Sequence, residues 1–173
     1  RSINGVANIF ANYRQATVGN PAPSDFDLTN PPDGAVGVGL TPLLQWEQAE
    51  FATAYDVTVS TEPDLTPVIW SDTNLSSTTA VIPAGLLDNC TTYYWSVVAS
   101  GFGGSTPSTP TPSSFTTALV GDINNSGLVD FNDLNFLLFQ YGSTGPNNAD
   151  LDGDNDVDFA DLNLLLSNYN QSC

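Results

Sequence analysis

The sequence predicts a mainly β protein with a small α-helical C-terminal part, in which an immunoglobulin-like β-sandwich precedes a duplicated two-helix unit. Two observations carry this prediction. Apolar and polar residues alternate in short runs between residues 22 and 118, which is typical of strands with one buried face. Between residues 119 and 170 a loop–helix pattern occurs twice, with a repeat of 28 residues. We therefore expect an N-terminal arm (1–21), a β segment (22–118) and a C-terminal module (119–173).

The charge balance excludes several classes of function. The 173 residues include 19 Asp and Glu but only two basic residues, Arg1 and Arg14, and no Lys or His. Binding to nucleic acid requires cationic side chains that neutralise phosphates, so we expect no nucleic-acid partner. The absence of His removes the commonest general base and the commonest transition-metal ligand. No apolar run is long enough to span a bilayer, so we expect no membrane insertion.

The arm contains both basic residues and no acidic one. Its stretch from Val6 to Tyr13 mixes apolar and polar residues and is expected to form an extended strand. We hypothesise that the arm docks on the acidic domains of a neighbouring molecule, or adds a strand to its sheet, which would build a head-to-tail filament. The alternative is a linker from an upstream domain. Because the chain lacks Met and begins with Arg1, we expect a processed form or a piece of a longer product.

The β segment is expected to hold about seven short strands separated by turn-forming residues. The clearest runs lie at residues 44–46, 55–59, 68–70, 79–82, 93–99 and 114–117. The Pro- and Thr-rich stretch 106–114 is either a stiff connector or the approach to the final strand, and Phe115 favours the second reading because it needs an apolar environment. Trp46, Trp70 and Trp95 are expected in the core or on a sheet face, and a carbohydrate-stacking platform is the alternative.

Three motifs of the β segment follow a recognisable pattern, TPxLxW (41–46), YxV (55–57) and TxYxxxVxA (91–99). With them, residues 22–118 resemble bacterial fibronectin type III domains. The resemblance implies that Trp46 is a core residue. It also implies that the hydroxyl of Tyr93 bonds to nearby backbone, an arrangement called the tyrosine corner. Cys90 departs from the family, where Gly is usual in this loop.

The strongest signal is the spacing of acidic residues in the C-terminal module. All nine of them are Asp, and they lie in two twelve-residue windows, 122–133 and 150–161. A calcium loop of the EF-hand kind takes oxygen ligands from positions 1, 3, 5, 7, 9 and 12, with position 7 contributing its backbone carbonyl. The residues at these positions are Asp122, Asn124, Ser126, Leu128, Asp130 and Asp133 in the first window, and Asp150, Asp152, Asp154, Asp156, Asp158 and Asp161 in the second.

Other positions of the two windows support the same interpretation. Position 6 holds Gly127 and Asn155, which tolerate the positive φ of a sharp turn. Position 8 holds Val129 and Val157, through which we expect the two loops to pair in a short β-like contact. Hard oxygen ligands in flexible loops favour Ca²⁺ over Mg²⁺, zinc or copper, so two Ca²⁺ ions are expected. Without metal, mutual repulsion of the carboxylates is expected to loosen the module.

Each window leads into a predicted helix, at residues 131–142 and 159–170. Apolar residues at helical spacing predict one stripe on each helix, and the two stripes should face each other in a small pseudo-twofold core. The stripes consist of Leu134, Leu137, Leu138 and Tyr141, and of Leu162, Leu165, Leu166 and Tyr169.

The segments GDINNSGLVDFNDL and ADLDGDNDVDFADL, with Asp at position 12 where an EF-hand has Glu, resemble type I dockerins over residues 119–170. The resemblance implies two calcium ions and a cohesin partner recognised through positions 10 and 11 of each loop. These positions hold Phe131, Asn132, Phe159 and Ala160, where the family usually has Ser, Thr or small polar pairs. We expect the two Phe side chains to pack against the β domain instead.

Several residues outside the windows are candidates for covalent modification. Cys90 and Cys173 lack metal-binding spacing and are expected to form a disulfide, either within one chain or between chains. Asn74, Asn89 and Asn170 lie in glycosylation sequons, whereas Asn124 is better explained as a calcium ligand. The composition is typical of a secreted or cell-surface protein, so an extracellular location is expected.

The sequence offers little support for catalysis, and Glu47 and Glu50 are better explained as a solvated pair than as a hydrolase site. We therefore expect a non-enzymatic, calcium-binding structural or assembly protein whose partner is another copy of itself. The alternative is the spacer and dockerin anchor of a secreted hydrolase, whose partner is a cohesin-like domain. A carbohydrate-binding module is a third, weaker interpretation.

Overall fold

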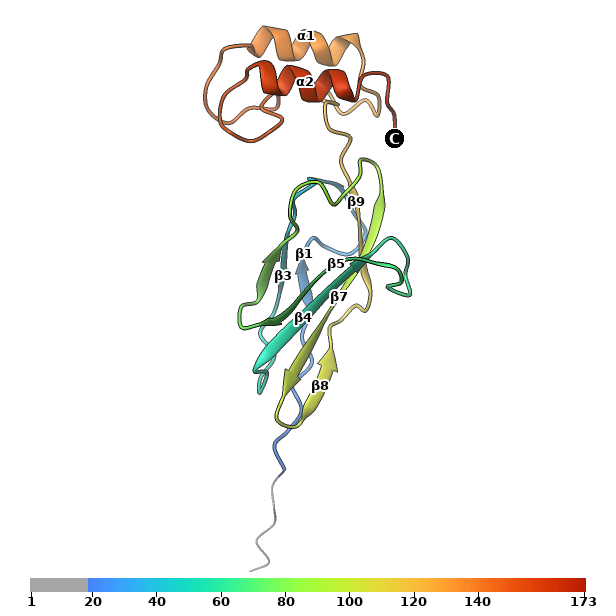
Figure 1. Cartoon of the computed structure of the whole chain (residues 1–173), viewed down its shortest axis with the longest axis vertical. Helices are drawn as coiled ribbons and strands as arrows, with labels where there is room; N and C mark the ends of the chain where they lie inside the picture. The colour runs from blue at the N-terminus through green and yellow to red at the C-terminus, as the bar shows by residue number, and fades with distance from the viewer. Residues whose placement is uncertain (1–18) are drawn as a thin grey trace, which may run out of the picture.

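The computed structural model describes residues 19–173 as an elongated molecule, with a β-sandwich that carries a pair of helices at one end (Figure 1). The strand expected between Val6 and Tyr13 lies outside the described residues. Neither helix in residues 19–173 has the length and apolar character needed to cross a membrane. The expected mainly β chain with a small α-helical part is confirmed.

Nine strands and two helices form within the described residues. They are β1 (Leu28–Asn30), β2 (Ala35–Val38), β3 (Leu43–Trp46), β4 (Ala54–Ser60), β5 (Val68–Leu75), β6 (Thr79–Val81), β7 (Thr92–Gly101), β8 (Gly104–Pro107), β9 (Ser113–Thr117), α1 (Phe131–Gln140) and α2 (Phe159–Ser167). The sequence predicted about seven strands, because the short β1, β2 and β8 carry almost no apolar alternation.

The strands form two sheets. The smaller has the order β1-β3-β6, and the larger has the order β2-β9-β7-β4-β5, with β8 paired to β7. All pairs are antiparallel except β2 with β9. This is the strand order that a fibronectin type III sandwich requires, so the structure bears out that expectation for the β segment.

The alternating residues fill the space between the sheets. On β7, Tyr93, Trp95, Val97 and Ala99 are almost fully buried, and Trp46 of β3 is only 3% exposed. Trp70 is half-buried and packs against the same core. Trp46 and Trp95 are therefore core residues and Trp70 packs on the core, within the predicted choice of core or sheet-face positions.

The Pro- and Thr-rich stretch leads into the last strand. Thr106 and Pro107 belong to β8, and β9 begins at Ser113. Phe115 is fully buried in the sandwich core and packs on Tyr93, with ring centroids 5.8 Å apart. The stretch is therefore part of the sandwich and not a connector between domains.

The tyrosine corner is present. The backbone N–H of Asp88 donates to the hydroxyl of Tyr93 at 2.9 Å, and Tyr93 is 1% exposed. This bond anchors the loop that carries Asn89 and Cys90, directly below the helical module.

Replacement of Tyr93 by Phe should lower the free energy of unfolding of the sandwich by about 1 kcal/mol, because the Asp88 N–H loses its acceptor. Urea denaturation followed by Trp fluorescence measures the change. Tyr94→Phe, on the half-buried neighbour in the same strand, is the matched control and should change stability less. Equal effects of the two variants would contradict a specific role for the Tyr93 hydroxyl.

Candidate metal site

Each acidic window ends inside the first turn of a helix. Asp130 and Asp158 are the N-cap residues of α1 and α2, and their side chains accept hydrogen bonds from Asn132 and Ala160. In return, the backbone N–H of each N-cap residue donates to the side chain three positions later, Asp133 or Asp161, which completes a capping box. Positions 9 and 12 of each window are therefore held in place by the helix start.

The carboxylate at position 12 closes each loop from within. Asp133 is fully buried, and its Oδ1 accepts from the N–H groups of Ile123 and Asn124 at 2.9 and 3.1 Å, while its Oδ2 accepts from Asp130 at 2.9 Å. The three donors are residues at positions 2, 3 and 9 of the same window. The backbone of the loop therefore surrounds this one side chain.

The second window repeats the arrangement around Asp161, which is also fully buried. Its Oδ1 accepts from Leu151 at 2.6 Å and from Asp152 at 3.2 Å, and its Oδ2 accepts from Asp158 at 2.8 Å. Each carboxylate oxygen has two lone pairs, so an oxygen with one donor retains acceptor capacity for a metal ion.

Position 1 holds the other end of each loop. Asp122 accepts from the N–H groups of Ser126 and Gly127, and Asp150 accepts from those of Gly153 and Asn155. Position 6 has the predicted positive φ in both loops, +82° at Gly127 and +73° at Asn155. Both windows thus form the same tight loop.

The structure gathers the carboxylates of the second window into two groups. Ligand atoms within each group lie within 4.8 Å of one another, and the groups are Asp150, Asp152 and Asp154, and Asp156, Asp158 and Asp161. The first window has only three carboxylates, Asp122, Asp130 and Asp133, and they form no such group in the part of the chain that the structure describes.

Neutral oxygens take the remaining positions of the first window. Asn124 Oδ1 accepts from the Ser126 N–H at 2.9 Å, and the Ser126 hydroxyl donates to the Leu128 carbonyl at 3.1 Å. Positions 3, 5 and 7 are therefore neighbours in this loop. The first loop can offer a cation mixed neutral and charged oxygens, whereas the second offers almost only carboxylates.

The donor set fits a hard divalent cation, and one atom in particular lacks a partner. Oδ1 of Asp156 is buried and has no hydrogen-bond partner. The carboxylates grouped with it, Asp158 and Asp161, are acceptors when ionised and cannot donate to it. No basic side chain lies within residues 19–173 to compensate these charges, since Arg1 and Arg14 both precede them. A buried carboxylate without a counter-charge is costly, and a cation at this place would remove the cost.

Two carboxylates of the second window have raised pKa values. Partial burial and the negative charges of Asp154 and Asp158 raise the pKa of Asp156 above its ordinary value. Partial burial also raises the pKa of Asp152, with a further contribution from repulsion by Asp154 and Asp161. Both groups hold protons more tightly than an isolated Asp, because loss of solvent and, after it, neighbouring negative charges disfavour their charged forms.

The prediction that Val129 and Val157 pair the two loops with each other is wrong. Val129 exchanges backbone hydrogen bonds with residues 170 and 171, and Val157 does so with residues 142 and 143. Each loop therefore pairs with the segment that follows the helix of the other repeat. The pairing segments also lie 28 residues apart, so the pseudo-twofold relation holds although the contact differs.

The predicted apolar stripes are only half correct. Leu137 and Leu165 are fully buried between the helices, and Leu134, Leu162 and Tyr169 pack against them. The outer members of the stripes remain 48–51% exposed, and these are Leu138, Tyr141 and Leu166. The module is small, so each helix contributes a single fully buried Leu to its core.

The two Phe residues at position 10 do not pack against the β domain. Phe131 is 61% exposed and Phe159 is 63% exposed. Each is the first residue of a helix, directly after the N-cap Asp. They remain on the surface of the module.

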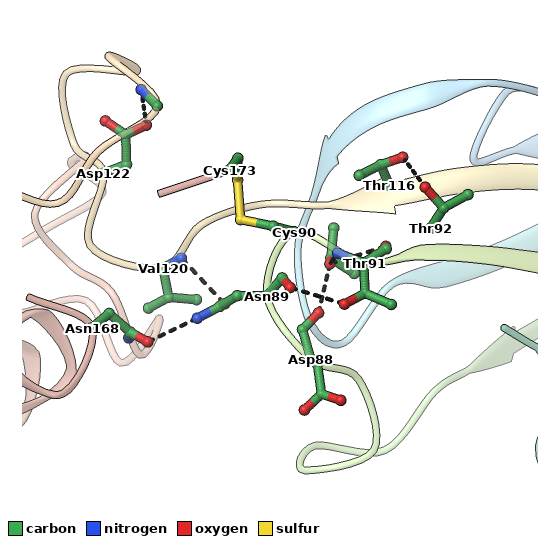
Figure 2. The surroundings of a disulfide bond; sticks show 12 residues. Asp88, Asn89, Cys90, Thr91, Thr92, Thr116, Val120, Asp122, Asn168 and Cys173 are labelled. Atoms are coloured by element: carbon green, nitrogen blue, oxygen red, sulfur yellow. Dashed lines mark hydrogen bonds between the residues drawn. A yellow bond between two sulfur atoms is a disulfide. The ribbon is translucent and has the colours of Figure 1, made fainter. Parts of the chain in front are cut away.

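A disulfide and two hydrogen bonds join the module to the sandwich. Cys90 and Cys173 of the same chain are bonded, so of the two alternatives left open by the sequence the structure has the bond within one chain. Asn89 donates to Asn168 Oδ1 at 2.8 Å and accepts from the Val120 N–H at 3.3 Å (Figure 2). Sequence analysis missed Asn89 and Asn168 as junction residues, because nothing local links positions 79 residues apart.

Cys90 adopts a left-handed backbone conformation, with φ of +52°. This explains why Gly would be the ordinary residue in this loop, since a side chain costs about 1–2 kcal/mol in that conformation. The bond to Cys173 and the packing of Cys90 against the core of the module stabilise it.

The glycosylation candidates differ in accessibility. Asn74 and Asn170 are exposed. The side-chain amide of half-buried Asn89 donates to Asn168, so a glycan on that nitrogen would displace the junction bond. Of the three predicted sites, Asn89 is therefore the one that the folded structure disfavours.

Comparisons with known proteins give matches among solved structures only. A scan against protein-family models finds no match for this chain, and neither does a search of curated proteins. An Fn3-like protein from Clostridium thermocellum is 28% identical, over 56% of this chain and 92% of that one, with a TM-score of 0.41. The fibronectin type III domain of human fibronectin type III domain containing protein 3 is 20% identical, over 59% and 92%, with a TM-score of 0.39. A Streptomyces avermitilis α-L-rhamnosidase is 24% identical over 60% of this chain but only 12% of the enzyme, with a TM-score of 0.45.

Proposed function

We propose that residues 119–173 are a dockerin-like module that binds two Ca²⁺ ions, and that the chain is a non-enzymatic component of an extracellular assembly. The observation that carries the proposal is the gathering of the second window's six carboxylates into two groups with no basic side chain among residues 19–173. When bound, Ca²⁺ would supply the positive charge that offsets their repulsion.

The ligands would come from matching positions of the two loops. In the first loop they would be Asp122, Asn124, Ser126, the Leu128 carbonyl, Asp130 and Asp133. In the second they would be Asp150, Asp152, Asp154, the Asp156 carbonyl, Asp158 and Asp161. The extra carboxylate of Asp156 would also remain close to the ion, which supports a stronger charge attraction at the second site.

The sandwich would act as a spacer that is fixed to the calcium module. The Cys90–Cys173 disulfide and the Asn89 hydrogen bonds support this role, because they tie the module to the loop anchored by Tyr93. A disulfide is also compatible with the oxidising conditions outside the cell.

The partner of the module is either another copy of this chain or a cohesin-like domain. Exposed aromatic residues on the module favour a protein partner of one of these kinds, since Phe131, Phe139 and Phe159 are all more than 60% exposed. Sedimentation velocity in millimolar Ca²⁺ separates the two, because self-association gives large species without any added protein.

Isothermal titration with Ca²⁺ tests the metal role through a single substitution. Asp161→Asn should weaken binding at the second loop at least about tenfold, because it removes one ligand charge and the acceptor for the Asp158 N–H. Asp72→Asn, which alters an exposed residue of β5, is the matched control and should leave both sites unchanged. Equal titrations of wild type and Asp161→Asn would contradict the proposed ligand set.

Calcium binding at the second loop should weaken on acidification more than at the first. The raised pKa values of Asp152 and Asp156 mean that protons compete with Ca²⁺ at higher pH than at ordinary carboxylates. The same protons stabilise the metal-free loop below the ordinary pKa of 3.8, and this stabilisation is lost as the pH rises through the raised values. Calcium titrations at about pH 7 and about pH 5 measure the loss of affinity. Asp133→Asn and Asp161→Asn each weaken one loop, so that the affinity of the other loop can be compared at the two pH values. A parallel decrease at both loops would contradict this prediction.

A further inference from the structure

The outer side of α1 carries exposed aromatic residues that have no aromatic counterpart in α2. Phe139 is 86% exposed and Phe136 is 51% exposed, and together with Asn132 and Asn135 they line a shallow hollow of about 270 Å³. We refer to these four residues as the α1 face. The positions of the two Phe residues in α2 hold Leu164 and Ser167, so the aromatic pair belongs to one repeat only.

The α1 face is uncharged but lies beside the most acidic loop of the molecule. The single acidic residue of α1, Asp133, is fully buried. Phe136 also lines a second hollow of about 340 Å³, whose wall includes Asn148 and Ala149. Ala149 directly precedes the second window, where six carboxylates would keep four negative charges after one Ca²⁺ has bound. An apolar and basic ligand would complement this surface.

Residues 1–18 of the chain have this chemistry. They contain the only two basic residues, Arg1 and Arg14, and no acidic one. An extended strand is expected from Val6 to Tyr13, but the spacing of Val6, Ile9, Phe10 and Tyr13 also fits one face of a helix. An amphipathic segment with such a face is the usual ligand of an apolar surface on a helical domain.

The described chain begins far from the α1 face. It starts at the end of the sandwich opposite the helices (Figure 1), where the backbone of Asn20 and Pro21 lies against Gly103 in the turn between β7 and β8. Residues 1–18 are therefore attached where they can meet the helical end of a second molecule. We propose that residues 1–18 of one copy dock on the α1 face of the next, with Arg14 toward the second acidic loop. This inference rests on the proposed assembly role and supplies the partner surface for it.

The experiment uses the full chain in millimolar Ca²⁺ and follows self-association by sedimentation velocity over a concentration series. Phe136→Ser combined with Phe139→Ser should weaken association at least about tenfold, since exposed aromatic anchors dominate such contacts. Phe102→Ser is the matched control, because Phe102 is 85% exposed on the turn between β7 and β8. Arg14→Gln should weaken association less than the double replacement and should make it less sensitive to salt. Circular dichroism and calcium titration check that each variant is folded.

A synthetic peptide of residues 1–18, added to the ¹⁵N-labelled full chain, identifies the surface. The inference predicts amide shift changes at the α1 face and competition with self-association. Unchanged self-association of the Phe136→Ser/Phe139→Ser chain would overturn the inference. A contact between residues 1–18 and the α1 face that does not depend on protein concentration would also overturn it, because the segment would then bind its own molecule. A chain that binds two Ca²⁺ but stays monomeric would overturn this inference and leave the calcium role intact. Assembly through the α1 face without calcium binding would support the inference and refute the calcium role.

Discussion

We expect excess chelator to unfold residues 119–173 and to leave the β-sandwich folded. The module buries only six apolar residues in its own core, compared with fifteen in the sandwich. Its nine carboxylates would then repel one another without a counter-ion, and the fully buried Asp133 and Asp161 would keep only backbone N–H groups as partners. The free energy of metal binding would thus be the main source of the module's stability.

Spectroscopy can follow the two parts of the chain separately. All three Trp residues belong to the sandwich, so Trp emission should change little in chelator. The helical circular dichroism signal and the dispersed amide resonances of residues 119–173 should disappear, and added Ca²⁺ should restore them. Mg²⁺ at the same concentration is the control and should restore them less completely. A fully folded module in chelator would contradict the expectation.

The second large effect concerns the disulfide, whose loss should weaken calcium binding at the first loop only. Residues 170–173 lie along this loop, where Cys173 donates to the Gly127 carbonyl at 3.1 Å and Ser172 is bridged to Leu128. Leu128 would supply the backbone carbonyl ligand. The disulfide fixes this segment to Cys90 of the sandwich, whereas the equivalent partner of the second loop, around Thr144, is not tethered.

Replacement of both cysteines by Ser should therefore reduce affinity at the first loop about tenfold and change the second loop little. The chain-entropy model adds a loss of about 4–5 kcal/mol in stability for a closed loop of 83 residues. Asp161→Asn weakens the second loop, so calcium titrations of chains with this added change measure the affinity of the first loop. Titrations with Asp133→Asn measure the affinity of the second loop in the same way. Wild type treated with reductant is the matched control for the serine substitutions. Equal weakening of both loops would contradict the coupling.

Local spacing was sufficient to predict the regular parts of the structure. Alternation located β4 and β7, and the positions of the acidic residues located the starts of α1 and α2 within one turn. The tyrosine corner followed from the resemblance of the motif around Tyr93. These features depend on residues close together in sequence, so a single chain contains the information.

Features that depend on distant residues were not predictable in the same way. The apolar character of Val129 and Val157 indicated pairing, but their partners are decided by how the two repeats pack together. Exposure of Phe131 and Phe159 depends on how small the module's core is. The bond between Asn89 and Asn168 exists only because the sandwich and the module meet at that loop.

Native mass spectrometry counts the calcium ions held by residues 119–173, because each bound ion adds to the mass of the intact chain. The protein is exchanged from millimolar Ca²⁺ into a volatile buffer, and a sample treated with chelator is the reference. We expect a mass increase of two Ca²⁺ for the wild type and of one for Asp161→Asn. A wild-type chain that carries no calcium would refute the proposed metal sites.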